Sequence, residues 1–348
     1  MQRVERHIIL KNKQIDELCF RSKNLYNLAN YHIRQEFIKT SKDVEEGKRE
    51  QANWIRYNEL DKILKSTEAY KSLPAQTAQQ TLRVLDKNWK SFFKSIKVWK
   101  KSPEKYQGRP KLPKYKHKIK GRNIVVFTNQ QCQIKNGFIT FPMKVLSPLK
   151  TKIENLNQVR VIPQSSCYVI EVIYTKEKEE NKNLKDNSYL SIDIGLNNLA
   201  TCINNLGFKP FVINGRPLKS INQYFNKKRA KLMSFIGDKG FSNKIAKLTL
   251  KRNNKISDYL HKTSKLIIDY CLVHEIKTIV IGHNSGWKQE IEIGKKNNQS
   301  FVSIPFNKLI EQIEYKAEDV GIEVLVREES HTSKCSFLDL EEIKHQVR

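Results

Sequence analysis

The stretch Tyr189-Leu-Ser-Ile-Asp-Ile-Gly, residues 189–195, has the pattern of the first strand in the second half of this chain. Leu190, Ile192 and Ile194 alternate with polar residues, and this period of two is typical of a strand that buries one face. Asp193 stands between two of these apolar residues. Because an unpaired carboxylate is costly to bury, Asp193 must face solvent, accept a structural hydrogen bond or bind a cation. The sequence leaves these alternatives open.

The residues that follow this strand alternate between strand and helix patterns. We expect short strands at 199–203 and 211–213, a long basic helical stretch at about 220–274, a strand at 278–282, a helix at about 305–320 and a strand at 322–326. Three strands followed by alternating helices and strands is the order of an RNase H-like α/β domain. The sequence therefore predicts this fold for the second half.

The first half has other periodicities. Residues 1–10 have the pattern of a short strand, and from 12 to 102 apolar residues recur every three or four positions, apart from a charged stretch at 41–50 that we expect to be a loop. Between 123 and 175, apolar runs separated by Gly, Asn and Pro predict a small antiparallel barrel or sheet. The charged stretch 176–187 separates the two halves.

Lysine and arginine are concentrated between Lys87 and Arg122, where 14 of them accompany one acid, Glu104. The lysines form one stripe of a predicted helix, and the extended, proline-containing segment that follows alternates Lys with Tyr. Cations bind phosphates and rings stack on bases, so this track predicts nucleic-acid binding, with a solvated helix face and a basic linker as the alternative. The expected contact residues are Lys90, Lys94, Lys97, Lys101, Tyr106, Arg109, Lys111, Lys114, Tyr115 and Lys116.

The whole composition points to a polyanionic partner. The 348 residues include 64 Lys and Arg against 36 Asp and Glu, a formal net charge of +28, which repels itself unless a polyanion offsets it. The six cysteines are scattered without a C-x-x-C pair, so we expect neither a disulfide framework nor a complete zinc site. No apolar run approaches the roughly 18 residues that span a bilayer, so we expect a cytoplasmic protein without a membrane partner.

Four stretches resemble the TnpB (OrfB) proteins of insertion sequences, which are relatives of the type V CRISPR effectors. They are Ser191-Ile-Asp-Ile-Gly-Leu-Asn-Asn-Leu-Ala-Thr, Asn214-Gly-Arg-Pro-Leu-Lys-Ser-Ile-Asn-Gln-Tyr-Phe-Asn-Lys-Lys, Ile279-Val-Ile-Gly-His-Asn-Ser-Gly-Trp-Lys-Gln-Glu and Glu328-Glu-Ser-His-Thr-Ser-Lys-Cys-Ser. The resemblance implies a transposase-associated, RNA-guided DNA endonuclease of the RuvC type. Its implied partners are DNA and a transposon-derived guide RNA, and its implied cofactor is Mg²⁺ in a two-ion site. Its implied location is the prokaryotic cytoplasm, in association with the nucleoid.

The resemblance also implies a multidomain α+β architecture. Residues 12–102 correspond to a helical recognition lobe, and residues 1–11 together with 103–185 correspond to a small wedge-like β-barrel domain. Residues 186–348 correspond to the RNase H-like (RuvC) nuclease domain. In that correspondence the chain lacks the C-terminal zinc ribbon and the last helix of the family, as if truncated, so we do not expect bound zinc.

The resemblance assigns catalytic and metal-binding roles to particular acids. Asp193 matches the first RuvC aspartate. Many relatives have a glutamate where this chain has Gly282, whereas some have one at the end of the next strand, which here is Glu329, with Glu328 as the fallback. Asp193 and Glu329 are therefore the expected metal ligands. If their strands are neighbours, about 4.8 Å apart, the two carboxylates can share one divalent ion. A solvated strand end is the alternative for both glutamates.

The third acid of the family has no match in this chain. Asp339, Glu341, Glu342 and His345 follow Cys335 in no comparable context. Because two-metal displacement stabilises both the attacking and the leaving oxygen, we expect target binding with inefficient cleavage. The alternative to an active endonuclease is a nuclease-dead, guide-RNA-dependent DNA-binding repressor or an inactive remnant.

Overall fold

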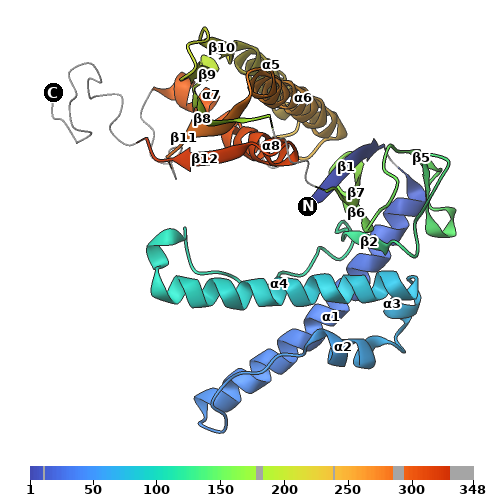
Figure 1. Ribbon diagram of the computed structural model, residues 1–348. Helices are drawn as coiled ribbons and strands as arrows, with labels where there is room; N and C mark the ends of the chain where they lie inside the picture. The colour runs from blue at the N-terminus through green and yellow to red at the C-terminus, as the bar shows by residue number, and fades with distance from the viewer. Residues whose placement is uncertain (11, 178–182, 238–239, 285–293, 330–348) are drawn as a thin grey trace. The chain divides into compact units, whose positions relative to one another are not determined.

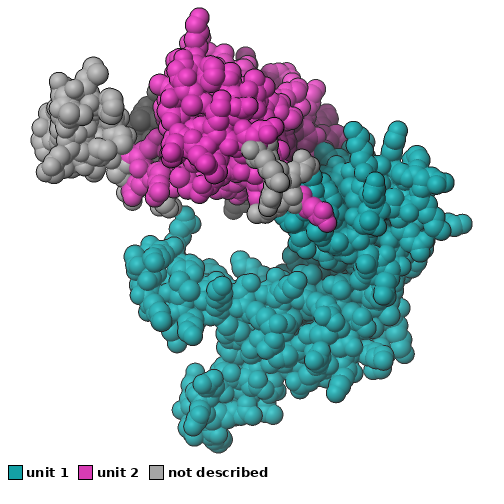
Figure 2. All heavy atoms as spheres, viewed as in Figure 1, with its two compact units in different colours: residues 1–176 teal, residues 177–348 magenta. Residues whose placement is uncertain are grey.

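The chain forms two compact units, residues 1–176 and 177–348, which Figure 2 colours separately. A computed structural model describes residues 1–10, 12–177, 183–237, 240–284 and 294–329. Each unit has its own hydrophobic core, and both units combine helices with sheets. Across these ranges no helix is long and apolar enough to cross a membrane. This arrangement agrees with the multidomain α+β fold class that the sequence predicts.

Two long helices, α1 (Lys13–Glu45) and α4 (Ala75–Lys101), cross in unit 1 (Figure 1). The short helices α2 (Tyr57–Leu64) and α3 (Glu68–Lys71) connect them. The side chain of Asn12 caps α1 by accepting the N–H of Ile15 at 2.9 Å. Trp89 is fully buried in the common core, and its indole N–H donates to Asn30 on α1 at 3.0 Å. α1 continues to Glu45, so the loop expected at 41–50 begins later than the sequence predicts.

The strands of unit 1 form two open antiparallel sheets. The larger has the order β1 (Gln2–Ile9), β7 (Tyr168–Thr175), β6 (Gln158–Pro163) and β2 (Val125–Thr128), and the smaller consists of β3 (Gln133–Lys135), β4 (Phe138–Thr140) and β5 (Leu149–Lys150). The described strands include no closed barrel, in contrast to the expected β-barrel domain. The helices explain this difference, since the apolar face of the larger sheet shares one core with α1 and α4 and has no need to close on itself.

Unit 2 is a five-stranded mixed sheet beside helices (Figure 1). Its order is β10 (Phe211–Asn214), β9 (Asn198–Asn204), β8 (Lys185–Asp193), β11 (Ile276–Gly282) and β12 (Glu323–Arg327). β8, β11 and β12 run parallel, and β9 and β10 are antiparallel to their neighbours. The helices are α5 (Arg216–Met233), α6 (Asn243–Val273), α7 (Lys295–Ser303) and α8 (Phe306–Asp319). The basic stretch expected as one helix thus forms two.

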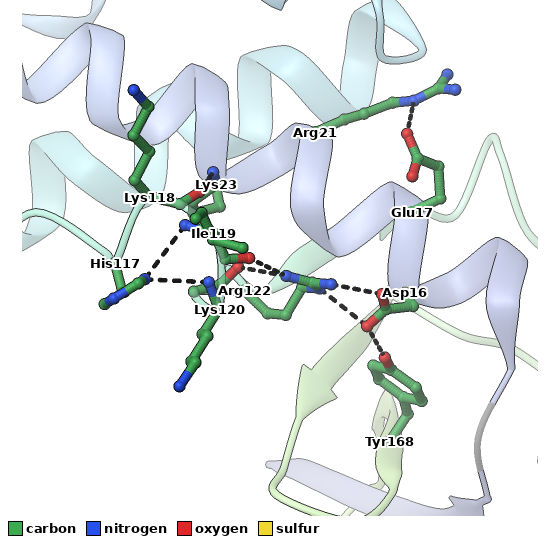
Figure 3. A network of polar contacts seen from close by, with 11 residues as sticks. Asp16, Glu17, Arg21, Lys23, His117, Lys118, Ile119, Lys120, Arg122 and Tyr168 are labelled. Atoms are coloured by element: carbon green, nitrogen blue, oxygen red, sulfur yellow. Dashed lines mark hydrogen bonds and ion pairs between the residues drawn. The ribbon is translucent and has the colours of Figure 1, made fainter.

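A polar network joins three distant segments of unit 1 (Figure 3). The guanidinium of Arg122 donates to both carboxylate oxygens of Asp16 on α1, at 2.9 and 2.6 Å, and the hydroxyl of Tyr168 on β7 donates to the same carboxylate. The hydrogen bonds from Arg122 are the main cause of a lowered pKa of Asp16. Burial and the neighbouring Asp16 raise the pKa of Tyr168. The network fixes the end of the basic segment between a helix and a sheet.

We expect Asp16→Asn to lower the free energy of unfolding at pH 7 by about 1 kcal/mol, because both partners are partly exposed and screened. A lowered folded-state pKa stabilises the fold above the unfolded value of about 3.9, and this stabilisation is lost as the pH falls through the folded value. The difference between variant and parent should therefore narrow below about pH 4 in urea titrations. Glu17→Gln, which removes an exposed pair with Arg21, is the control and should cost less. A pH-independent difference would contradict the assignment.

Candidate active site and nucleic-acid interface

Asp193 is the last residue of β8 and lies on the face of the strand opposite the core. Ile192 and Ile194 are buried in the core of unit 2, and Asp193 between them is exposed. The strand alternation therefore explains how the carboxylate avoids burial, since it faces solvent at a strand end. Cation binding by Asp193 stays a prediction. Such an end is a rigid platform for a functional group.

Gly282 lies beside Asp193 at the end of the next strand. Ile281 of β11 pairs with Ile192 of β8, and the strands are parallel, so residue 282 is next in register to Asp193 and faces the same side. The space that a Cβ atom of residue 282 would take is filled by the carboxylate of Glu329. Glycine at position 282 thus makes room for a glutamate that comes from another strand.

Glu329 follows the end of β12 and is held there by its backbone. Its N–H donates to Oδ1 of Asn284 at 2.6 Å, and the N–H of His283 donates to the carbonyl of Arg327 at 2.8 Å. These contacts tie the residues after β12 to those after β11. The result is a glutamate whose side chain reaches over the end of β11 at Gly282.

Two negative charges meet at this edge of the sheet. Burial and, secondarily, the charge of Asp193 raise the pKa of Glu329. The carboxylates of the two predicted acids are therefore close enough for the charge of one to affect the pKa of the other. Oxygen ligands of this kind suit a divalent cation, which would relieve their repulsion.

The sequence predicts a shared ion if the two strands are neighbours, and this condition is not met. β11 separates β8 from β12, so the strands are not adjacent, and only the absent side chain of Gly282 lets Glu329 approach. Glu328 is exposed at the strand end. In the described ranges no cluster of three or more His, Cys, Asp or Glu residues is placed to hold a metal. Cys335, Asp339, Glu341, Glu342 and His345 lie outside those ranges.

The basic track begins on the exposed face of α4. Lys94, Lys97 and Lys101 are exposed. Lys90 differs from them, because its ammonium pairs with the buried carboxylate of Asp86 at 2.7 Å. Three of the four predicted helix lysines are therefore available to phosphates, and the fourth also stabilises the fold.

The extended part of the track is fastened to α1 through its backbone. The amide of Asn27 donates to the carbonyl of Lys116 at 2.8 Å and accepts the N–H of the same residue at 2.8 Å. Asn30 and Arg34 donate to the carbonyl of Pro113. Because these bonds use main-chain atoms, the lysine side chains of the segment point outward, and the predicted contacts Lys111, Lys114 and Lys116 are exposed.

The rings of the track are partly engaged already. Tyr115 is 43 % exposed, and the guanidinium of Arg34 lies 4.7 Å from its ring centroid. Arg109 lies 5.9 Å from the ring centroid of Trp99, and Tyr106 is half-buried. Base stacking by Tyr106 and Tyr115 stays a prediction.

Sequence reasoning missed the stripe of α1 that holds this segment. Its members recur at three or four residues and each contacts the basic segment by a hydrogen bond, an ion pair or a ring; they are Asp16, Phe20, Lys23, Asn27, Asn30 and Arg34. A polar stripe at helical period was the available signal. It was inconspicuous because polar residues on a helix usually face water.

We expect Glu329→Gln to stabilise the metal-free protein slightly at pH 7. A raised folded-state pKa means that the folded chain holds the proton more strongly, so stability falls as the pH rises from the unfolded value of about 4.3 through the folded one. The increase in the free energy of unfolding should be at most about 1 kcal/mol, because Glu329 is partly exposed, and it should vanish below about pH 4. Thermal unfolding in chelator measures it, with Glu328→Gln as the control. Destabilisation at pH 7 would contradict the like-charge contact.

Replacing Lys94, Lys97 and Lys101 by Gln should weaken RNA binding and flatten the slope of log K against log salt by up to about 0.9 for each phosphate that is no longer neutralised. The control replaces Lys62, Lys65 and Lys71, which are exposed in the same unit and change the charge equally. Lys90→Gln should affect affinity less than Lys94→Gln, because Lys90 is paired. An unchanged slope in the first variant would exclude the track from the interface.

Three comparisons place the chain among known proteins. The OrfB_IS605 family model, described as a probable transposase, matches residues 169–288. A TnpB-like protein of Methanocaldococcus jannaschii is 32 % identical over 120 residues, which cover 34 % of this chain and 43 % of the relative. A CRISPR-associated endodeoxyribonuclease Cas12f2 of a Micrarchaeota archaeon is 29 % identical over 197 residues, 50 % of this chain and 35 % of the relative. The matches thus span less than half the length of either relative.

The fold has a solved counterpart. A cryo-EM structure of a Cas12f1–sgRNA–target DNA complex contains a chain similar to this one, with a TM-score of 0.52 and 14 % identity over 92 % of this chain and 75 % of that one. At this identity the likeness concerns the fold. The matched residues 169–288 include three of the elements around Asp193, namely β8, β9 and β11. The resemblance of this chain to the TnpB (OrfB) family, which its four motifs predict, is confirmed.

Proposed function

We propose that this protein is a TnpB-type, transposon-associated RNA-guided DNA endonuclease whose unit 2 contains an RNase H-like (RuvC) nuclease domain. The observation that carries the proposal is the pair of carboxylates of Asp193 and Glu329 at the end of three parallel strands. The strand order β10-β9-β8-β11-β12 supports the domain assignment, since three antiparallel strands are followed by two parallel ones reached through helices.

Asp193 and Glu329 would hold a divalent cation such as Mg²⁺. Their oxygens are the hard ligands that this ion prefers. Burial and, secondarily, the charge of Asp193 raise the pKa of Glu329, and a bound cation would offset both effects. When bound, such an ion activates water and stabilises charge on the phosphate. The protein's own contribution is to hold two carboxylates on one rigid edge.

The guide RNA and the target DNA are the proposed partners. The net charge of +28 favours polyanionic partners, and the outward lysines of the basic track in unit 1 offer them a surface. The names of the similar proteins, a Cas12f2 endodeoxyribonuclease and a Cas12f1 complex with sgRNA and target DNA, support the same partners. We assign residues 12–102 to the recognition lobe, 1–11 with 103–185 to the wedge-like part and 186–348 to the nuclease part.

The proposed function is tested by co-expressing the protein with RNA from its flanking locus, sequencing the bound RNA, and measuring guided cleavage in Mg²⁺ and Mn²⁺. Asp193→Ala and Glu329→Gln should each lower cleavage by at least about 10²-fold, the usual cost of one preorganised electrostatic group, while guided binding persists. Glu328→Gln is the matched control. Cleavage that is indifferent to Asp193 would refute the assigned site, and guided binding without cleavage would favour the repressor.

A carboxylate exchange tests the geometry of the site. Gly282→Glu alone should abolish cleavage, because its side chain collides with Glu329. Combining Gly282→Glu with Glu329→Gly should restore part of it, because a carboxylate again lies beside Asp193. The expectation of inefficient cleavage for lack of a third acid stays a prediction, to be checked by appending the C-terminal segment of a TnpB relative.

A further inference from the structure

Helices α5 and α6 form a second basic surface, distinct from the track in unit 1. Residues 216–257 contain twelve Lys and Arg and one acid. The remainder of α6 is balanced, since Lys262 pairs with Asp258 at 2.8 Å and Lys265 with Asp269 at 2.6 Å. The charge excess is therefore confined to α5 and the first half of α6, where no described lysine has a carboxylate partner.

A pocket of about 270 Å³ opens between the two helices within this basic region. Residues of α5 that are three or four positions apart line one side of the pocket, and residues of α6 with the same spacing line the other side. Its chemically distinctive members are the rings of Tyr224 and Phe225 and the cations of Lys251, Arg252 and Lys255. The volume lies just below the roughly 300–1,000 Å³ of drug-sized ligand sites, so it admits one small planar group.

Arg252, one of the cations that line the pocket, is held in place by hydrogen bonds. The guanidinium of Arg252 donates to Oδ1 of Asn222 at 2.8 Å and to the carbonyl of Ser303 at 2.7 Å, and it lies 5.6 Å from the ring centroid of Phe225. Lys251 and Lys255 are exposed at the rim, one turn apart on α6. Tyr224 is 59 % exposed. The ammonium of Lys228 lies 5.8 Å from the centroid of the Tyr224 ring. A fixed cation, an exposed ring and two exposed ammonium groups thus surround the opening.

Further rings accompany these cations where α5 leads into α6. Phe235 and Phe241 are 75 % and 68 % exposed. Exposed aromatic rings interleaved with unpaired cations are the pattern of surfaces that bind single-stranded nucleic acid, because rings stack on bases while cations bind phosphates. An acidic protein partner would need the cations but would leave the rings without a role.

We propose that the α5–α6 pocket binds one unstacked nucleotide of a single-stranded nucleic acid. The base stacks on Tyr224, and Lys251 and Lys255 bind the flanking phosphates. A duplex does not fit, since its bases are already stacked inside the helix. This site is separate from Asp193 and Glu329, and its occupation requires neither cleavage nor a guide.

The test uses the full chain with ten-nucleotide single-stranded RNA and DNA probes, and the corresponding duplexes, each carrying one 2-aminopurine. Anisotropy measures affinity, and 2-aminopurine emission reports stacking. Tyr224→Leu should weaken single-strand binding by about 5- to 150-fold, the range for one stacked base, and abolish the emission change, whereas Tyr224→Phe should retain both. The RNA and DNA arms decide which strand is preferred.

The phosphate contacts are tested on the same helix. Replacing Lys251 and Lys255 by Gln should lower affinity and flatten its salt dependence, whereas the matched control, Lys262→Gln with Lys265→Gln, should change neither much because those cations are paired. Equal losses in both double variants, an unchanged emission response in Tyr224→Leu, or equal dependence on Tyr224 for duplex would overturn the proposal. So would an acidic peptide that binds with the same losses.

Discussion

The excess of positive charge limits how many basic residues of this protein can form ion pairs. With 36 acids for 64 basic residues, two buried acids of unit 1 each pair with two cations. Glu171 in β7 pairs with Arg6 and Arg160, and Asp86 in α4 pairs with Lys90 and Arg56. These pairs fix the interior of unit 1, where desolvation would otherwise penalise the charges. The remaining cations are left on the surface, where the two basic regions arise.

Main-chain hydrogen bonding determines how one of those surfaces is displayed. Because α1 holds the segment near Pro113 and Lys116 by its carbonyl and amide groups, the lysine side chains are not needed to fix the segment. An extended chain alternates its side chains, so the charges of neighbouring lysines are also kept apart. The fold thus stabilises a basic segment without neutralising it, which a nucleic-acid interface requires.

The carboxylate pair illustrates the opposite use of charge. Asp193 and Glu329 repel one another, and the pKa of Glu329 is raised first by burial and then by the charge of Asp193. A glycine on the intervening strand permits this arrangement, since any side chain at position 282 would displace the glutamate. Such strain at a rigid strand end is typical of functional sites, where groups are positioned for a ligand rather than for stability.

The sequence by itself determined the elements around Asp193, because the period-two pattern with buried Ile192 and Ile194 has one consistent solution as a strand. It also determined the basic character of both halves, which depends on composition alone. The tertiary structure alone shows that β11 separates β8 from β12 and that no closed barrel forms among the described strands. These features depend on which distant segments meet, and local periodicity carries no information about strand order or about the partner that a side chain finds across the fold.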